Sequence, residues 1–342
     1  MNILITGGAG FIGCHLAHHF GRAGHAITVY DNLSRHGSES NLEWLQHSLP
    51  AGCLRFVHAD VRDAERIAAV TRGQNAVFHL AGQVAVTTSV INPREDFEIN
   101  AWGAFNVLEA ARLSGDNPIF IYSSTNKVYG GMEDTAVVEG ETRYSFAEMP
   151  LGVPETQPLD FHSPYGVSKG SGDQYVRDYA RIYRLPTVVF RQSAIYGPRQ
   201  FGVEDQGWLA FFAISAALGR PITIYGDGKQ VRDLLYIDDL AQAFELAVER
   251  IDRVAGRVYN IGGGPAYTLS IWAEAGPLLE KASGRRLEVR YADWRPGDQR
   301  IYVSDIRQAE RELGWRPLVG PEEGLGRMWK WILENKHLFE TG

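Results

Sequence analysis

The chain has 342 residues, of which 34 are Lys or Arg and 41 are Asp or Glu, so its formal net charge is −7. A mildly acidic chain without a run of basic residues lacks the electrostatic signature of a nucleic-acid-binding protein, and two cysteines are too few for a disulfide framework. The hydrophobic share of 44% is that of a globular protein, while the 37 glycines are unusually many, about 11% against an average near 7%.

Short apolar runs alternate with longer amphipathic stretches through the first half of the chain. The predicted strands are 2–6, 26–30, 54–58, 76–80, 118–122 and 187–190. The predicted helices between them include 62–72, 97–113 and 164–183. Nearly all-apolar strands that alternate with helices indicate a parallel sheet covered on both faces. We therefore predict an α/β fold built on a Rossmann-type doubly wound parallel sheet.

The second half of the chain is less regular. A strand and turn at 222–228 lead to a predicted helix near 238–249 and a strand at 257–261. A C-terminal stretch rich in Arg, Trp and Pro follows. Earlier in the chain, the Pro-rich region 132–160 is expected to form a long functional loop rather than a linker.

These patterns divide the chain into two predicted domains. We expect a cofactor-binding Rossmann domain at 1–190, to which 231–262 returns. Residues 191–230 and 263–342 are expected to form a smaller, mixed α/β substrate domain. The longest apolar run, 208–218, is too short to span a bilayer, and no basic segment precedes the first apolar run. We therefore expect a cytoplasmic protein without a membrane partner.

A glycine-rich loop directly follows the first predicted strand. Its skeleton is Gly7-x-x-Gly10-x-x-Gly13, with Phe11 and Ile12 between the last two glycines. Glycine allows a tight turn and a close approach to a pyrophosphate, and the N-terminus of the following helix supplies N–H donors and the positive end of a dipole. The loop therefore predicts a dinucleotide site, the alternative being an ordinary strand-to-helix turn.

An acidic residue ends the next strand. Asp31 follows Gly13 by 18 residues, and a carboxylate at this place can accept both ribose hydroxyls and repel the 2′-phosphate of NADP. The sequence therefore favours NAD, although Arg35 is close enough in sequence to receive such a phosphate. Residues at the ends of neighbouring strands complete the expected cofactor site: Asn32, Asp60, Val61, Leu80, Ala81, Gln83 and Ser123.

A tyrosine and a lysine stand four residues apart in the predicted helix 164–183. Tyr165 and Lys169 would share one helix face. A tyrosine with a pKa of about 10 is a poor base at neutral pH, but a neighbouring ammonium and the positive nicotinamide ring of NAD⁺ would lower that pKa. The hydroxyls of the strand end Ser123-Ser124-Thr125 could hold the oxygen of a substrate opposite the tyrosine.

The order of glycine loop, Ser/Thr strand end and Tyr/Lys pair resembles the extended short-chain dehydrogenase/reductase family, which includes nucleotide-sugar epimerases and dehydratases. The resemblance covers essentially the whole chain. It implies that Thr125, Tyr165 and Lys169 form the catalytic triad, that Tyr165 and Lys169 also contact NAD, and that Asn100 lies near the cofactor. It further implies a homodimer or homotetramer. The two cysteines, Cys14 and Cys53, show no metal-ligand spacing, so no metal is expected.

Two arginine-containing segments resemble the family's sugar-nucleotide site. They are 226–233, which contains Arg232, and 295–300, which ends in Arg300. Arginines suit this role because a bridging diphosphate carries two negative charges. The resemblance therefore implies that both arginines bind a nucleotide-sugar substrate.

The residues after the triad threonine separate branches of the family. Sugar-nucleotide 4,6-dehydratases resemble Thr-Asp-Glu here, where the two carboxyls serve as acid and base, whereas this chain has Thr125-Asn126-Lys127. Ala194 stands where many 4-epimerases carry an Asn. Three strings are similar to the 2-epimerases of CDP-hexoses: 123–130, 159–166 and 197–201 with its continuation 205–208. They add Asn126, Lys127, Arg199 and Gln200 to the expected substrate site.

The resemblance implies NAD-dependent epimerisation at C2 of a CDP-hexose, through transient oxidation to a 2-keto sugar. Another nucleotide-sugar enzyme, such as a 4-epimerase, dehydrogenase or decarboxylase, is the alternative within the family. A catalytically silent NAD(H)-binding regulator is the alternative outside it, and the intact triad argues against that role.

Overall fold

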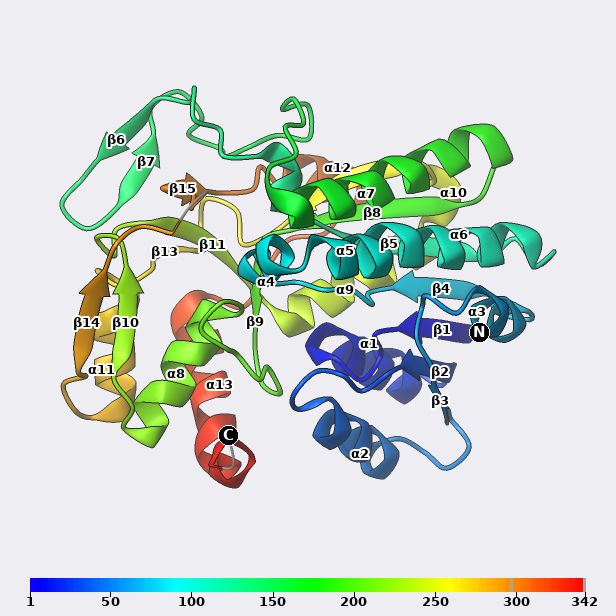
Figure 1. The fold of residues 1–342 in the computed structure, drawn as a ribbon, viewed down its shortest axis with the longest axis horizontal. Helices are drawn as coiled ribbons and strands as arrows, with labels where there is room; N and C mark the ends of the chain where they lie inside the picture. The colour runs from blue at the N-terminus through cyan, green and yellow to red at the C-terminus, as the bar shows by residue number, and fades with distance from the viewer. Residues whose placement is uncertain (296–297, 341–342) are drawn as a thin grey trace.

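The computed structural model describes residues 1–295 and 298–340. Its centre is a seven-stranded sheet in the order β12-β8-β5-β4-β1-β2-β3 (Figure 1), and every neighbouring pair of strands is parallel. The strands are β1 (Asn2–Thr6), β2 (Ala26–Asp31), β3 (Leu54–His58), β4 (Ala76–His79), β5 (Ile119–Thr125), β8 (Thr187–Gln192) and β12 (Arg257–Ile261). The predicted doubly wound parallel sheet is therefore confirmed.

The strands are apolar on both faces because helices cover both. On β1, Ile3 and Ile5 pack into one core and Leu4 into the other, as the two-residue period of a strand requires. One layer contains α1 (Phe11–Arg22), α2 (Ser38–Ser48) and α9 (Ile237–Glu249). The opposite layer contains α3 (Ala64–Thr71), α6 (Gly103–Leu113) and α7 (Ser163–Tyr183).

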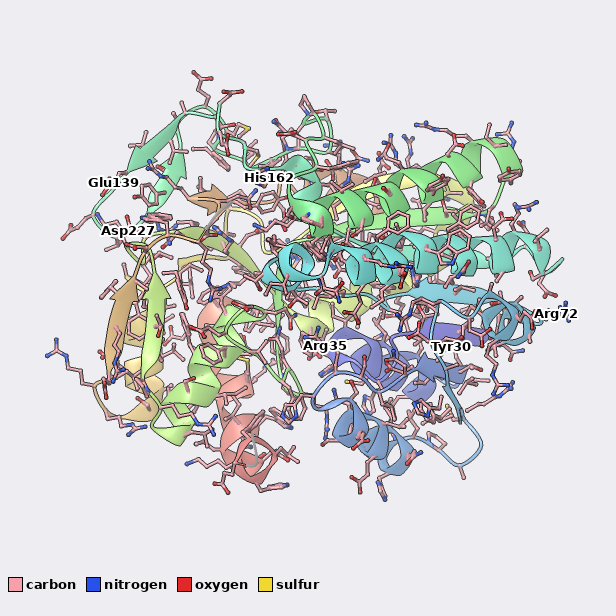
Figure 2. All side chains as sticks on the ribbon, in the orientation of Figure 1. Tyr30, Arg35, Arg72, Glu139, His162 and Asp227 are labelled. Atoms are coloured by element: carbon pink, nitrogen blue, oxygen red, sulfur yellow. The ribbon has the colours of Figure 1, made fainter. Side chains whose placement is uncertain are left out.

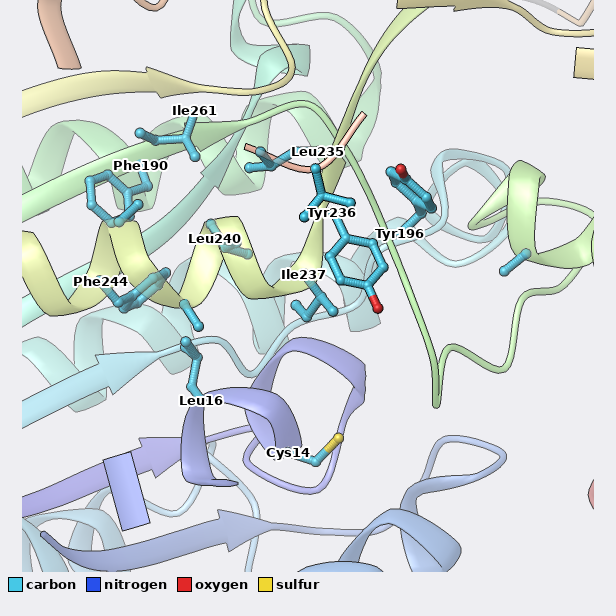
Figure 3. Close-up of a cluster of buried hydrophobic side chains, with 14 of the residues drawn as sticks. Cys14, Leu16, Phe190, Tyr196, Leu235, Tyr236, Ile237, Leu240, Phe244 and Ile261 are labelled. Atoms are coloured by element: carbon cyan, nitrogen blue, oxygen red, sulfur yellow. The ribbon is translucent and has the colours of Figure 1, made fainter. Parts of the chain in front are cut away.

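Helix α9 shows how the second half of the chain joins this core. Phe244 lies edge-on against Phe190 of β8 with 5.1 Å between ring centroids, and Figure 3 shows Phe244, Leu240 and Ile237 along this helix with Leu16 of α1 below them. Together with β12, this helix places parts of the segment 231–262 on the sheet. The exact division into two domains remains a prediction.

The rest of the second half forms small sheets beside the main one (Figure 1). Strand β11 (Val231–Tyr236) pairs with β9 (Ala194–Tyr196), β13 (Thr268–Ser270) and β15 (Ile301–Tyr302). Strand β10 (Ile222–Tyr225) pairs with β14 (Val289–Ala292). The helices of this region are α8 (Trp208–Leu218), α10 (Ile251–Val254), α11 (Ala275–Ser283), α12 (Arg307–Leu313), α13 (Pro321–Glu334) and the short η3 (Lys336–Phe339). None of the described helices is long and apolar enough to cross a membrane.

Region 132–160, expected to be one long loop, contains a β-hairpin. Strands β6 (Val137–Glu139) and β7 (Tyr144–Phe146) pair antiparallel, and the Tyr144 hydroxyl donates to Asp227 at 2.6 Å. Figure 2 shows Glu139 and Asp227 at this corner of the molecule. Strands of three residues carry too short a pattern to be recognised in the sequence, so the hairpin depends on its tertiary contacts.

The predicted helix 97–113 is also divided in the structure. Short helices α4 (Val86–Ile91) and α5 (Pro93–Phe97) lead into a π-helical turn, η1 (Glu98–Trp102), before α6 begins. Such turns interrupt helices at places where side chains must be redirected, frequently at functional sites. A 3₁₀ turn, η2 (Asn126–Tyr129), directly follows β5.

Candidate active site

The strands of the main sheet end at a cleft of about 690 Å³. It lies where the strand order reverses between β1 and β4, the place at which open α/β sheets bind ligands. Most of the predicted site residues line it: Gly7, Gly10, Phe11, Ile12, Gly13, Asp31, Asn32, Asp60, Val61, Leu80, Ala81, Gln83, Ser123, Thr125, Tyr165, Lys169, Arg199 and Gln200. The other five, Asn100, Asn126, Lys127, Arg232 and Arg300, are not among the residues that line this cleft.

The glycine loop fits a pyrophosphate. Gly7 has a φ of 70°, which favours glycine, and a Cβ atom on Gly13 would collide with the carbonyl oxygen of Gly7. Gly10 is the N-cap of α1, and no described side chain caps that helix. The first N–H groups of α1 are therefore available to an anion, with the positive end of the helix dipole behind them.

Asp31 has more partners than the sequence indicates. Its carboxylate accepts the backbone N–H of Ala9 at 3.0 Å and that of Leu33 at 2.8 Å. Each carboxylate oxygen keeps a further lone pair for a ribose hydroxyl. Arg35 lies across the cleft and donates to the side chain of Gln206 at 2.8 Å; Figure 2 shows it near the centre of the molecule. The guanidinium of Arg35 is therefore hydrogen-bonded to another residue that lines the cleft.

The neighbouring strand end is held by an ion pair. Asp60 binds Arg62 at 2.8 Å and accepts a hydrogen bond from the amide of Asn32, also at 2.8 Å. The hydrogen bond from Arg62 is the main reason why the pKa of Asp60 falls to about 2. The carboxylate is therefore charged at neutral pH, and Asn32 reaches the cleft with its side chain fixed.

The predicted triad comes together on one wall of the cleft. Thr125 ends β5, while Tyr165 and Lys169 lie in the first two turns of α7. Burial raises the pKa of Tyr165 to about 12, and a hydrogen bond with Thr125 only partly opposes the rise. This differs from the lowered pKa expected from the Tyr/Lys pair, because burial outweighs the attraction of nearby cations.

The ammonium of Lys169 contacts two groups of β5. Its Nζ donates to the backbone carbonyl of Ser123 at 2.5 Å and lies 4.3 Å from the ring centroid of Tyr122. Burial lowers the pKa of Lys169 to about 7. Its charge near neutral pH therefore depends on the electrostatic surroundings.

The predicted Asn126 and Lys127 lie in the turn that follows Thr125. The backbone N–H of Lys127 donates to the Thr125 hydroxyl oxygen, and that hydroxyl donates to the amide oxygen of Asn126, both at 3.3 Å. The Lys127 ammonium donates to Gln299 at 3.2 Å, and Gln299 donates in turn to the carbonyl of Gly130 at 2.5 Å. Burial, aided by the charge of Arg232, lowers the pKa of Lys127 to about 8.

The two predicted diphosphate arginines lie on neighbouring segments of chain, where the backbone N–H of Val231 donates to the Arg300 carbonyl at 2.9 Å, but their side chains have different partners. Arg232 pairs with Asp298 at 2.7 Å. The guanidinium of Arg300 lies 5.5 Å from the ring centroid of Tyr144 and 5.9 Å from that of Trp294. Their joint contact with one diphosphate stays a prediction.

Asn100 acts on the cleft through a neighbour. It is buried in η1, where its amide oxygen accepts the backbone N–H of Gln83 and its amide nitrogen donates to the Gln83 carbonyl, both at 2.9 Å. These two bonds fix the loop after β4, which lines the cleft.

The sequence missed several polar residues of the cleft. Gln192 and Trp208 line it, and each has a buried side-chain nitrogen without a hydrogen-bond partner among the described residues. The buried amide oxygen of Gln200 also has no hydrogen-bond partner among the described residues. Buried polar atoms normally have partners, so these atoms fit a polar ligand. Gln192 could have been found had the predicted strand 187–190 been extended by two residues.

The histidines of α1 serve packing. His15 bonds the Pro198 carbonyl through Nε2 at 2.9 Å, and His18 stacks on Trp44 with 4.6 Å between ring centroids. Across the described residues, no group of three potential metal ligands gathers.

A doubly wound sheet, an uncapped glycine loop and a Thr–Tyr–Lys group on one cleft are typical of a dinucleotide-dependent enzyme. Comparison with known proteins agrees. Residues 3–262 match the model of the NAD dependent epimerase/dehydratase family, and the chain belongs to this family. Its cofactor is NAD.

Curated relatives and solved structures cover nearly the whole chain. The chain is 44% identical to the CDP-paratose 2-epimerase of Salmonella typhi over 97% of this chain and 99% of that one. It is 35% identical to a dTDP-glucose 4,6-dehydratase of Salmonella typhimurium, over 98% and 93%. Two similar structures are the UDP-glucose 4-epimerase of Thermotoga maritima with UDP-glucose (TM-score 0.82, 33% identity, 98% and 100% covered) and a Streptomyces venezuelae dTDP-glucose 4,6-dehydratase with NAD bound (TM-score 0.84, 31%, 99% of each).

Proposed function

We propose that this enzyme is an isomerase that inverts C2 of the sugar in a CDP-hexose, converting CDP-paratose to CDP-tyvelose or acting on a related sugar such as CDP-glucose. The similarity to the Salmonella typhi relative supports the substrate. One observation carries the choice of epimerisation over elimination of water: Thr125 is followed by the amide of Asn126 and the amine of Lys127. The acid and base carboxyls that a 4,6-dehydratase needs at these positions are replaced.

Each step of the proposed epimerisation is assigned to a residue of the triad. Tyr165 takes the proton of the C2 hydroxyl, Thr125 holds the same oxygen through its own hydroxyl, and Lys169 binds the cofactor ribose and orients it. NAD supplies the acceptor and donor of the C2 hydride and, when oxidised, a positive charge beside the tyrosine. After oxidation, the 2-keto sugar presents its other face, and Tyr165 returns the proton as the hydride comes back. The configuration changes without net oxidation.

The electrostatics of the cleft make cofactor loading a precondition for this chemistry. With a pKa raised to about 12 by burial, Tyr165 keeps its proton at neutral pH. A positive charge beside a phenol favours the phenolate. We therefore expect Tyr165 to become an effective base only in the NAD-loaded protein.

The substrate side of the cleft is assigned from charge and position. Arg199 lines the cleft with its guanidinium 4.0 Å above the Trp44 ring. We assign Arg232 and Arg300 to the diphosphate, and Gln200, Asn126 and Lys127 to the sugar. Arginine is suited to a diphosphate because its fork of donors matches phosphate oxygens.

We also propose a homodimer or homotetramer formed through α6 and α7. Apolar side chains are exposed along this region, among them Trp102, Val167, Tyr175 and Ile182. Large exposed apolar patches commonly mark protein interfaces.

The proposed function is tested by incubating the NAD-loaded enzyme with CDP-paratose, CDP-glucose, UDP-glucose and dTDP-glucose separately, and reading the sugar configuration by NMR. Inversion at C2 of a CDP-sugar, without accumulation of NADH absorbance, is expected. Inversion at C4 would instead make the protein a 4-epimerase. Steady production of NADH would make it a dehydrogenase, and loss of carbon dioxide from a uronic-acid substrate added to the panel would make it a decarboxylase.

A further inference from the structure

A buried carboxylate lies behind the triad, in α5. Asp96 is 1% exposed. One of its oxygens accepts the hydroxyl of Ser168 at 2.5 Å, and the other accepts the amides of Gln83 at 2.9 Å and Asn100 at 3.0 Å. Three neutral donors thus point at one carboxylate, and among the described residues no cation forms an ion pair with it.

Each of these donors is linked to the cleft. Ser168 stands between Tyr165 and Lys169 on α7. Gln83 lines the cleft, and its backbone is held in turn by Asn100. Asp96 therefore connects the helix that carries the catalytic pair to the loop that borders the cofactor. The π-helical turn η1, which begins two residues later, brings Asn100 into the same cluster.

The charge of Asp96 acts on Lys169 without a competing cation. The other buried carboxylate near Lys169 is Asp173, one turn further along α7, and it is neutralised by Arg191 at 2.8 and 2.9 Å. His79 of β4 also faces Lys169, but burial lowers its pKa to about 3, so it is uncharged near neutral pH. Among the described residues Asp96 forms no ion pair; burial raises its pKa, and the hydrogen bonds from Ser168 and Gln83 and the charge of Lys169 oppose that rise.

The remaining groups that face the pair give the direction of the effect. Tyr122 of β5 presents its ring to Lys169, and Arg35 is the cation near Tyr165. Burial lowers the pKa of Lys169, and Asp173 and Asp96 both oppose this. The same negative charge raises the pKa of Tyr165. Removing the charge of Asp96 should therefore lower both pKa values.

We propose that Asp96 is a positioning residue for the Tyr165–Lys169 pair: it fixes α7 against the cofactor loop and keeps the Lys169 ammonium charged. The inference rests on the roles proposed above for the triad. It adds a residue that touches neither substrate nor cofactor and acts through Ser168, Gln83 and the electric field.

The direct test follows Lys169 itself. The chain has six lysines, so lysine labelled with ¹³C at the ε carbon gives few NMR signals, and a Lys169→Met variant assigns the one of interest. In the NAD-loaded protein, Asp96→Asn should lower the titration midpoint of Lys169 by about one pH unit, as expected for losing one nearby opposite charge. Glu98→Gln, which removes a half-exposed carboxylate two residues away, is the matched control and should leave the midpoint unchanged.

A second variant guards against misfolding. In Asp96→Asn the new amide keeps the bonds from Gln83 and Asn100 only if its oxygen takes the place of the carboxylate oxygen that accepts them and its NH2 group faces the Ser168 hydroxyl; the flipped orientation sets donors against donors and can destabilise the fold. Asp96→Ser removes the same charge with a smaller side chain. An unshifted Lys169 midpoint in whichever folded variant is obtained, or failure of both variants to fold, would show that Asp96 is a structural residue and overturn the proposal.

Activity supplies an independent measurement. In Asp96→Ser, both limbs of the pH profile of turnover should move to lower pH, whereas a purely structural defect lowers turnover without moving them. If the protein did not epimerise CDP-hexoses, the proposed function would fail while the lysine titration would still decide the role of Asp96.

Discussion

At the scale of single residues, Tyr165 is the proposed catalytic base. It is buried, bonded to Thr125, and faces the cleft. Replacing Tyr165 with Phe should reduce turnover by about 10²–10⁴-fold, the usual contribution of a positioned acid or base. NAD should remain bound, because the glycine loop and Asp31 are untouched. Turnover and cofactor content of the purified variant check this, and retained activity would remove Tyr165 from the role of base.

Residues were predictable from the sequence where the chemistry is local. The glycine loop, Asp31 and the Tyr165/Lys169 pair have fixed spacings that reflect one turn or one strand. Asp96 could not be found in this way, because its partner Ser168 lies 72 residues away and only folding brings them together. The raised pKa of Tyr165 could not be predicted from the sequence either, because it depends on how deeply this part of α7 is buried.

At the scale of elements, the turn between β1 and α1 sets the shape of the cofactor site. Gly13→Ala would force a Cβ atom against the Gly7 carbonyl, so it should lower the melting temperature and abolish NAD retention. Gly326→Ala is the control: this glycine lies in α13, where an added Cβ meets nothing within 4 Å.

The control should behave in the opposite direction. Alanine favours a helix over glycine by about 1 kcal/mol, so Gly326→Ala should keep NAD and raise stability slightly. Thermal unfolding and the absorbance of bound cofactor measure both variants. Normal NAD binding by Gly13→Ala would contradict the packing described for the loop.

The elements that sequence patterns predicted best are those buried on both faces of the sheet. Runs such as 2–6 and 76–80 are largely apolar and bounded by turns, and their limits agree within one residue with β1 and β4. Strands β6, β7 and β13 have three residues each, which is too few for a recognisable pattern. β6 and β7 pair with each other, whereas β13 pairs with the distant β11, a contact about which local periodicity contains no information.

At the scale of the whole molecule, buried neutral histidines make stability depend on pH. Burial lowers the pKa of His79 to about 3 and that of His15 to about 4, from an ordinary value of 6.5. Below pH 6.5 the unfolded chain binds protons at these positions and the folded chain does not. Stability is therefore complete above pH 6.5 and falls as the pH decreases toward the two lowered pKa values.

The contribution of His79 to the pH dependence of stability can be measured by replacing it. Between pH 7 and pH 5, His79→Gln should lose about 2 kcal/mol less unfolding free energy than the wild type, since one proton contributes about 1.4 kcal/mol per pH unit. Urea unfolding at both pH values measures it, with the exposed His47→Gln as control. Equal losses in the wild type and His79→Gln would show that His79 is not kept neutral by the fold.

The overall topology followed from the alternation of strands and helices, but the arrangement of the second half did not. Strand β11 binds three strands that come from widely separated parts of the chain, and α9 returns to the main sheet to pack on Phe190. Such long-range pairing is decided by the packing of the finished molecule. The substrate side of the cleft is therefore the part of the site that was least predictable from the sequence.

The central claim is that C2 is inverted by removing a hydride and returning it within the same active site. The NAD-loaded enzyme is incubated with the CDP-hexose in deuterated water, and the product is examined by NMR. The account predicts inversion at C2 with the original hydrogen retained there, because the hydride never exchanges with solvent. Deuterium at C2 would show that a proton is removed and replaced instead, and would contradict the account.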